Sequence, residues 1–221
     1  MRRRLVKYAL TALAVVLVCS GVLLGPGLYR NTHRGDEVAR LIRRMELRPG
    51  MTVAEVGAGE GRMLIPMAQQ LGSGTTVLAT DIDLAALDKL RSAVARATLA
   101  NVVVIEGGEH ETKLPDGCCD AIMMADVYHH LTDPSSMTAS LFKSVRPGGR
   151  LAVVDFAPSP WLFWLRRPAG LPVDRGGHGV PSGIVVEELH RAGFLIDRVA
   201  DDWWRFVPRR YCVFAHKPPS C

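Results

Sequence analysis

The sequence predicts an α/β fold in which a mostly parallel sheet is covered by helices on both faces, with one apolar helix in front of it. From Asn31 onward, short apolar runs alternate with amphipathic segments, a pattern typical of parallel strands joined by crossover helices. The 221 residues, of which 48% are hydrophobic and 22% charged, suffice for one sizeable domain and a short additional segment.

The apolar segment lies at the start of the chain. Four basic residues within the first seven positions precede 17 uncharged residues, from Tyr8 to Leu24. That length is the lower limit for crossing a bilayer. We therefore predict a membrane anchor in residues 1–30, with a secretory signal peptide as the alternative. Basic residues on the two sides of the segment are nearly balanced, so they do not indicate which side the domain faces.

Residues 31–221 form the predicted domain. A leading helix over 36–47 places Val38, Leu41 and Met45 on one face, with Asp36 as its candidate N-cap. Strands are predicted at 52–56, 76–80, 102–106, 121–125, 151–156, 195–203 and 210–217. Further helices are predicted at 62–71, 84–97, 134–145 and 183–194. These seven strands and the helices between them give a Rossmann-like sheet.

One stretch, residues 157–182, does not follow this alternation. It is rich in proline and glycine and has no regular period. A connection of this length inside a domain is usually functional, so we predict a lid or substrate loop. Its aromatic residues stand beside arginines, namely Trp161, Phe163, Trp164, Arg166 and Arg167. Such a mixture suits a membrane interface and a lipophilic ligand, the alternative being that the aromatic residues pack the loop onto the domain.

Charge and cysteine content argue against two classes of site. The net charge of +5 is not gathered into one basic stripe, so no nucleic-acid partner is expected. None of the five cysteines forms a C-x-x-C pair. We therefore predict no metal site and interpret the cysteines as free thiols in a reducing compartment.

A glycine-rich turn, EVGAGEG, follows the first predicted strand. Its glycines have the spacing G-x-G-x-G, at Gly57, Gly59 and Gly61. Arg62 stands where a dinucleotide-binding turn has its third glycine. Glu55 and Glu60 flank the turn and disfavour a polyphosphate. The turn therefore favours a ligand that carries an ammonium or sulfonium group.

A further acid, Asp81, ends the second predicted strand, 20 residues after Gly61. In open α/β sheets, ligands lie across the carboxyl ends of the strands. A carboxylate at this point can accept hydrogen bonds from both hydroxyls of a ribose. The alternative is that Asp81 caps the next helix, a role that Asp83 could fill equally well.

With these motifs, roughly residues 36–217 resemble the class I S-adenosylmethionine-dependent methyltransferases, above all the small-molecule branch that includes quinone-biosynthesis-type enzymes. The segments that carry the resemblance are EVGAGEG, the acid at Asp81, LPDGCCDAIMMADVYHHL and SVRPGGRLAVVDF. The resemblance implies a Rossmann-like fold, S-adenosylmethionine as cofactor, and methyl transfer to a small-molecule acceptor.

The resemblance also implies cofactor-binding residues. The methionine part would lie against the glycine turn, the ribose on an acid, and the adenine against an apolar side chain and an acid. The residues in these roles are Glu55, near the ammonium, then Gly57, Ala58, Gly59 and Gly61 in the turn, Asp81 at the ribose, and Ile82 and Glu109 at the adenine.

Catalytic candidates follow the fourth predicted strand, where the family places groups facing the methyl. They are Asp126, Tyr128, His129 and His130. A sulfonium methyl is already activated, so base catalysis by either histidine is an optional addition to alignment of the reactants. Neighbouring side chains diverge, so the two histidines are not expected to bind one metal ion.

An alternative function is a non-catalytic methyltransferase-like scaffold or sensor that binds the nucleoside. A nicotinamide oxidoreductase is disfavoured by the glycine spacing. The cytosolic origin of S-adenosylmethionine and the unpaired cysteines favour a membrane-anchored, single-pass protein whose domain lies on the cytoplasmic face. Export after signal cleavage is the alternative location.

Overall fold

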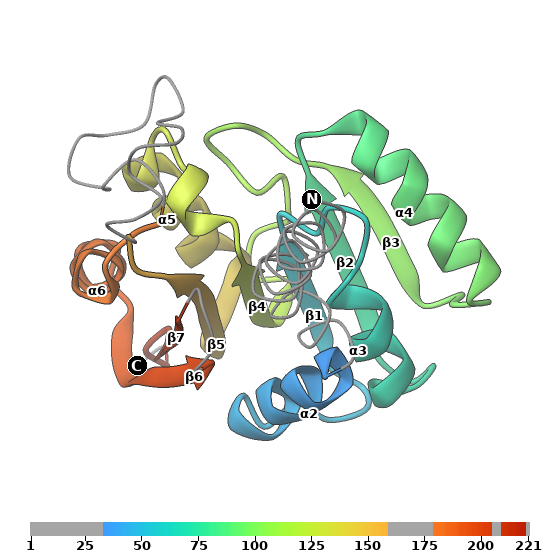
Figure 1. Ribbon diagram of the computed structural model, residues 1–221, viewed down its shortest axis with the longest axis horizontal. Helices are drawn as coiled ribbons and strands as arrows, with labels where there is room; N and C mark the ends of the chain where they lie inside the picture. Colours follow the sequence, from blue (N-terminus) through green and yellow to red (C-terminus); the bar gives the residue numbers. More distant parts are fainter. Residues whose placement is uncertain (1–32, 159–178, 205–208, 220–221) are drawn as a thin grey trace, which may run out of the picture.

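The computed structural model describes residues 33–158, 179–204 and 209–219 (Figure 1). The predicted anchor or signal segment, residues 1–30, lies outside the described residues, as does most of the predicted lid, residues 159–178. In the ranges that are described, none of the helices is both long enough and apolar enough to cross a membrane.

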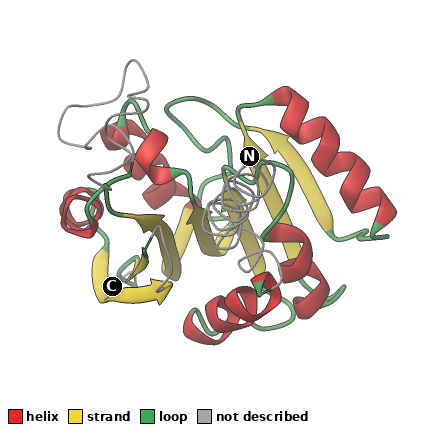
Figure 2. Cartoon of the chain, viewed as in Figure 1, coloured by secondary structure: helices red, strands yellow, loops and turns green. Residues whose placement is uncertain are grey.

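A seven-stranded sheet forms the centre of the described structure (Figure 2). Its strands are β1 (Thr52–Val56), β2 (Thr76–Asp81), β3 (Val102–Glu106), β4 (Cys119–Ala125), β5 (Val145–Phe156), β6 (Leu195–Trp204) and β7 (Arg210–His216). They lie in the order β3-β2-β1-β4-β5-β7-β6, and β7 runs antiparallel to both of its neighbours. The predicted seven-stranded, mostly parallel sheet is thus confirmed.

Helices cover both faces of this sheet, as predicted. They are α2 (Arg34–Arg44), α3 (Leu64–Leu71), α4 (Leu84–Arg96), α5 (Pro134–Ser144) and α6 (Ser182–Arg191), with a short 3-10 helix, η1 (Tyr128–His130). One face packs against α2, α3 and α4, and the other against α5 and α6. Val38, Leu41 and Met45 of the first helical segment are buried together, which confirms its predicted apolar face.

Several predicted boundaries were wrong, among them the starts of the first helix and of the fifth strand. The first helix begins at Arg34, so Asp36 lies in its first turn, while His33 occupies the cap position without a side-chain cap. An acid in the first turn still stabilises the helix through its dipole. β5 begins at Val145 rather than at 151, because Cys119 of β4 pairs with Val145 and extends the ladder across a register shift.

The carboxyl ends of β1, β2, β4 and β5 meet at one edge of the sheet because these strands are parallel. The strand order reverses between β1 and β4, with β2 and β3 on one side and β5 to β7 on the other. In open α/β sheets, ligands bind at such a reversal. The fold therefore brings the turn after β1, Asp81 and the segment after β4 to one place.

Candidate active site

The turn after β1 contains three glycines with positive φ, but only one of them borders open space. A Cβ at Gly57 would lie 2.4 Å from Val127 Cγ2, and one at Gly61 would lie 2.4 Å from Leu90 Cδ1. At Gly59, with φ of 51°, a Cβ would meet no atom within 4 Å. Gly57 and Gly61 thus allow close packing, while Gly59 leaves room in which a ligand can approach the backbone.

Asp81 fastens this turn to the end of β2. Its Oδ2 accepts the backbone N–H of Gly59 at 2.7 Å, and its Oδ1 accepts that of Asp83 at 2.9 Å. Asp83 is the N-cap of α4 and accepts the backbone N–H groups of Ala85 and Ala86. Capping is therefore the role of Asp83, and both oxygens of Asp81 keep lone pairs for the hydroxyls of a ligand.

A cavity of about 330 Å³ lies at this edge of the sheet. Gly57, Asp81, Ile82 and Glu109 all line it. Ile82 is 63% exposed, so it offers an apolar surface to a ligand. Glu109 accepts a hydrogen bond from the hydroxyl of Thr132 at 3.1 Å, across the same cavity. The structure therefore brings together the residues expected at the ribose and the adenine.

Glu55 belongs to β1, just before this turn, and only 3% of it is exposed to solvent. Among the described residues, its Oε2 has no hydrogen-bond partner. Burial raises the pKa of the Glu55 carboxyl well above its usual range, and Asp81 and Asp126 raise it further, while Arg34 acts in the opposite direction. A buried carboxyl with an open oxygen can bind a positively charged ligand group.

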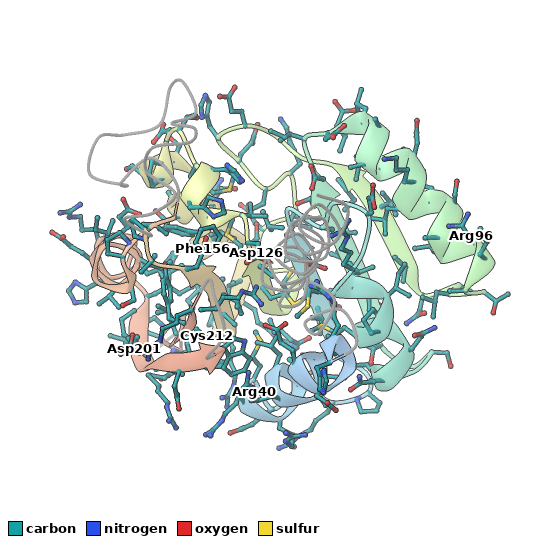
Figure 3. The ribbon with its side chains drawn as sticks, in the orientation of Figure 1. Arg40, Arg96, Asp126, Phe156, Asp201 and Cys212 are labelled. Carbon is teal, nitrogen blue, oxygen red and sulfur yellow. The ribbon has the colours of Figure 1, made fainter. Side chains whose placement is uncertain are left out.

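Asp126 follows β4 in the left-handed conformation, with φ of 59°. Figure 3 shows Asp126 and Phe156 at the neighbouring ends of β4 and β5. The Oδ1 of Asp126 lies 2.8 Å from Nη2 of Arg210, whose side chain is fully buried. The same guanidinium places Nη1 2.6 Å from Oε1 of Glu37 in α2. Arg210 therefore fixes Asp126 at the end of β4 through an ion pair, and Asp126 does not itself line the cavity.

His129 is paired with Asp155, the penultimate residue of β5. The Nδ1 of His129 lies 2.9 Å from Oδ1 of Asp155. The carboxylate also accepts the backbone N–H groups of His129 and Phe156, at 3.0 and 2.8 Å. Because Asp155 is the acceptor, we assign the ring proton of His129 to Nδ1 rather than to Nε2. His129 does not line the cavity.

The other two candidates after β4 differ in their surroundings. His130 is exposed and lines the cavity, and its ring centroid lies 3.9 Å from that of His129. The rings are in contact because the segment forms a 3-10 turn, whereas divergence was expected. Tyr128 is fully buried, and its hydroxyl donates to Oε2 of Glu188 at 2.8 Å. Tyr128 therefore lies in the core rather than in the cavity.

The described ranges hold no cluster of three His, Cys, Asp or Glu side chains that could bind a metal ion.

Residues 54–153 match the family model described as a methyltransferase domain. These residues are therefore similar to a methyltransferase domain. A ubiquinone/menaquinone biosynthesis C-methyltransferase, UbiE, from Vibrio cholerae is 29% identical over 114 residues, which are 50% of this chain and 43% of that protein. Phosphoethanolamine N-methyltransferase 1 from Zea mays is 29% identical over 140 residues, 62% of this chain and 27% of that protein. The chain thus spans less than half the length of these curated relatives.

A solved structure supports the same domain assignment. The S-adenosylmethionine-dependent methyltransferase from Aquifex aeolicus superposes with a TM-score of 0.66 at 25% identity, covering 80% of this chain and 88% of that chain. The matched model, the relatives and this neighbour are all described as methyltransferases, and together they support S-adenosylmethionine as the cofactor.

The residues at this edge of the sheet fit this cofactor. The space beside Gly59, which a Cβ would fill, admits a ligand against the backbone. The open oxygen of Glu55 suits the ammonium of the methionine part. Asp81 and Ile82 line one cavity. Asp81 can accept further hydrogen bonds there and Ile82 has an exposed apolar surface, and a bound nucleoside requires both.

Sequence reasoning missed three charged residues of the site. Asp155 carried a usable signal, because it stands near the carboxyl end of a predicted strand, as Asp81 does. Arg210 and Glu37 carried none. They lie in the last strand and the first helix, 173 residues apart, and only the folded chain brings them together beneath Asp126.

Proposed function

We propose that this protein transfers a methyl group from S-adenosylmethionine to a small, lipophilic acceptor. The observation that carries the proposal is the cavity at the carboxyl edge of the sheet, where Gly57, Asp81 and Ile82 meet. The buried Glu55 lies two residues before Gly57 in the chain. A nucleoside with a cationic amino-acid tail matches this arrangement of an apolar wall, a hydroxyl acceptor and a buried acid. The methyltransferase-domain match over residues 54–153 supports the same reading.

Each binding residue has one task in this proposal. Asp81 accepts hydrogen bonds from the two ribose hydroxyls, and Ile82 packs on the adenine. Glu109, which lines the same cavity, accepts a hydrogen bond from the adenine amine. Glu55 binds the ammonium with its open oxygen, and Gly59 lets the methionine part approach the turn.

When bound, S-adenosylmethionine supplies a methyl group that a positively charged sulfur has already activated. The main task of the protein is then to hold the acceptor in line, and such positioning contributes up to about 7–11 kcal/mol in favourable cases. For an acceptor that must lose a proton, we propose His129, a buried histidine whose ring contacts the cavity-lining His130, as the base. Asp155 holds the ring of His129 in place through Nδ1. A base of this kind adds about 10²–10⁴-fold in rate.

A lipophilic acceptor is supported by two features. The curated relative from Vibrio cholerae is named for ubiquinone and menaquinone biosynthesis. In the sequence, residues 1–30 contain an uncharged run long enough to reach across a bilayer, and residues 157–182 mix aromatic residues with arginines. We include in the proposal that residues 1–30 anchor the protein in a membrane, with the domain on the cytoplasmic face.

The proposal is tested by methyl transfer from radiolabelled S-adenosylmethionine to a panel of acceptors. The panel contains demethylated quinones in detergent and water-soluble amines such as phosphoethanolamine. We expect label in the quinone fraction with the full-length protein and, at a cofactor concentration below saturation, about tenfold less label or lower with Asp81→Asn. Label in the amine fraction alone would overturn the lipophilic acceptor. Binding of the cofactor without transfer to any compound would favour the non-catalytic scaffold instead.

A further inference from the structure

The face of the sheet that α2 covers continues beyond the end of that helix. Arg150 of β5 lies opposite His216 of β7, and Phe214 of β7 lies opposite Arg198 of β6. Opposed residues, and residues two apart on one strand, point to the same face, so these four side chains share a face. Phe214 packs in the core beneath α2, which identifies the face as the one that α2 covers.

These side chains form a cleft with the end of the helix. Arg44, the last residue of α2, lines it together with Arg150, Arg198 and His216, and its volume is about 370 Å³. This volume is in the range of small-molecule pockets, roughly 300–1,000 Å³. The cleft borders the start of β6 and the end of the antiparallel β7, so it is distinct from the cavity that Asp81 lines.

The charges in this cleft are only partly neutralised. Nη2 of Arg150 lies 2.7 Å from Oε2 of Glu46, and Nδ1 of His216 lies 2.7 Å from Oδ1 of Asp197. Arg44 and Arg198 form no ion pair with any described residue. Three guanidinium groups thus line the cleft together with one carboxylate, that of Asp197, and two of the three have no ion-pair partner in the part of the chain that the structure describes.

We propose that this cleft binds a phosphate group, carried either by a free small molecule or by a lipid. Guanidinium groups bind phosphate oxygens through paired, charge-assisted hydrogen bonds, and Arg44 and Arg198 are available for such bonds. Phe214, which also lines the cleft, provides an apolar wall for the organic part of the ligand.

The first test is calorimetric titration of the full 221-residue chain, in a non-ionic detergent, with inorganic phosphate and with phenyl phosphate. The double variant Arg44→Gln/Arg198→Gln removes the two unpaired charges of the cleft. Its control is Arg43→Gln/Arg96→Gln, which removes two exposed arginines that do not line the cleft (Arg96 is labelled on α4 in Figure 3). We expect binding to weaken about 10- to 100-fold in the first variant only.

Cosedimentation with vesicles identifies the source of the phosphate. If the soluble phosphates bind, and bind more weakly to Arg44→Gln/Arg198→Gln, the ligand of the cleft is a free phosphate compound. A preference for phosphatidylglycerol over phosphatidylcholine vesicles that only Arg44→Gln/Arg198→Gln loses assigns a lipid headgroup. The proposal is wrong if neither probe binds, or if this variant binds as the control does. Circular dichroism on each variant confirms that a loss of binding is not a loss of folding.

Discussion

His129 and Asp155 form a buried pair in which Nδ1 of the ring lies 2.9 Å from Oδ1 of the carboxylate. Only 3% of His129 and none of Asp155 is exposed to solvent. The carboxylate also accepts two backbone N–H groups, so it is held in one orientation. A carboxylate that is held in this way fixes the orientation of the histidine ring bonded to it.

For an acceptor that loses a proton, Asp155→Asn should lower turnover by about 10²–10⁴-fold. The affinity for S-adenosylmethionine should stay unchanged, because the cofactor is bound by other residues. Steady-state rates with an acceptor found in the panel, and a calorimetric titration of the cofactor, measure the two effects separately. Asp116→Asn, at an exposed ion pair with Lys143, is the control. Full turnover in Asp155→Asn would exclude the pair from proton transfer.

Glu55→Gln should change how stability depends on pH. Burial raises the pKa of the folded carboxyl well above the value of 4.5 that an unperturbed glutamate has. The stability that Glu55 contributes is therefore complete below pH 4.5 and is lost as pH rises through the folded pKa. The glutamine cannot ionise and should escape this loss. Urea unfolding at a series of pH values should show that the free energy of unfolding of Glu55→Gln rises relative to that of the parent protein as the pH rises. The same pH dependence in both proteins would contradict a raised pKa of Glu55.

The same substitution, Glu55→Gln, should weaken binding of the cofactor. An amide cannot match the attraction of a carboxylate for an ammonium, so Glu55→Gln should bind S-adenosylmethionine less tightly at neutral pH. The parent should also release protons on binding, since the ammonium favours the ionised carboxyl. Titrations in two buffers of different ionisation enthalpy measure this release, which Glu55→Gln should lack.

Alanine substitutions in the turn after β1 should separate ligand binding from folding. Gly59→Ala places a methyl group in open space and should cost about 1–2 kcal/mol for its left-handed backbone, while cofactor affinity falls sharply. Gly61→Ala should destabilise the fold more, because its Cβ would lie 2.4 Å from Leu90 Cδ1. Denaturant unfolding and cofactor titration of both variants test this. Full cofactor affinity in Gly59→Ala would place the methionine part elsewhere.

Arg210→Met should destabilise the protein strongly. The substitution leaves Glu37 and Asp126 without their shared buried cation, and loss of one partner of a buried pair costs about 3–5 kcal/mol. Glu37→Gln/Arg210→Met should recover part of the loss, because one of the stranded charges is removed. Arg191→Gln, at an exposed pair with Glu187, should cost no more than about 0.5 kcal/mol. Equal unfolding free energies for Arg210→Met and Arg191→Gln would contradict a structural role of the buried pair.

Much of this fold could be predicted from local patterns in the sequence. The strand over 52–56 and its glycine turn were predicted because an apolar run ends at residues that permit positive φ. The start of α2 was missed, since no side chain caps it. The position of Asp81 was predicted from its place at a strand end, and the structure adds that Asp83 takes the capping role.

The charged partners beneath the site were not predictable in this way. His129 and Asp155 are 26 residues apart, and Arg210 and Glu37 are 173 apart. Such pairs depend on strand order and on the packing of α2 against the sheet, neither of which leaves a periodic signal in the sequence. Only the register of β5 and β7 places Arg210 opposite Phe156, at the same edge as Asp155.

The most direct test of the central claim is calorimetric titration of the full-length protein with S-adenosylmethionine, with NADH as the comparison ligand. We predict that S-adenosylmethionine binds and NADH does not. Asp81→Asn should weaken binding about tenfold or more, because hydrogen bonds from ligand hydroxyls to a carboxylate are lost. Asp83→Ala should keep the affinity, although loss of the α4 cap costs about 0.5–2 kcal/mol of stability. Binding of NADH, or unchanged affinity in Asp81→Asn, would contradict the proposed S-adenosylmethionine site.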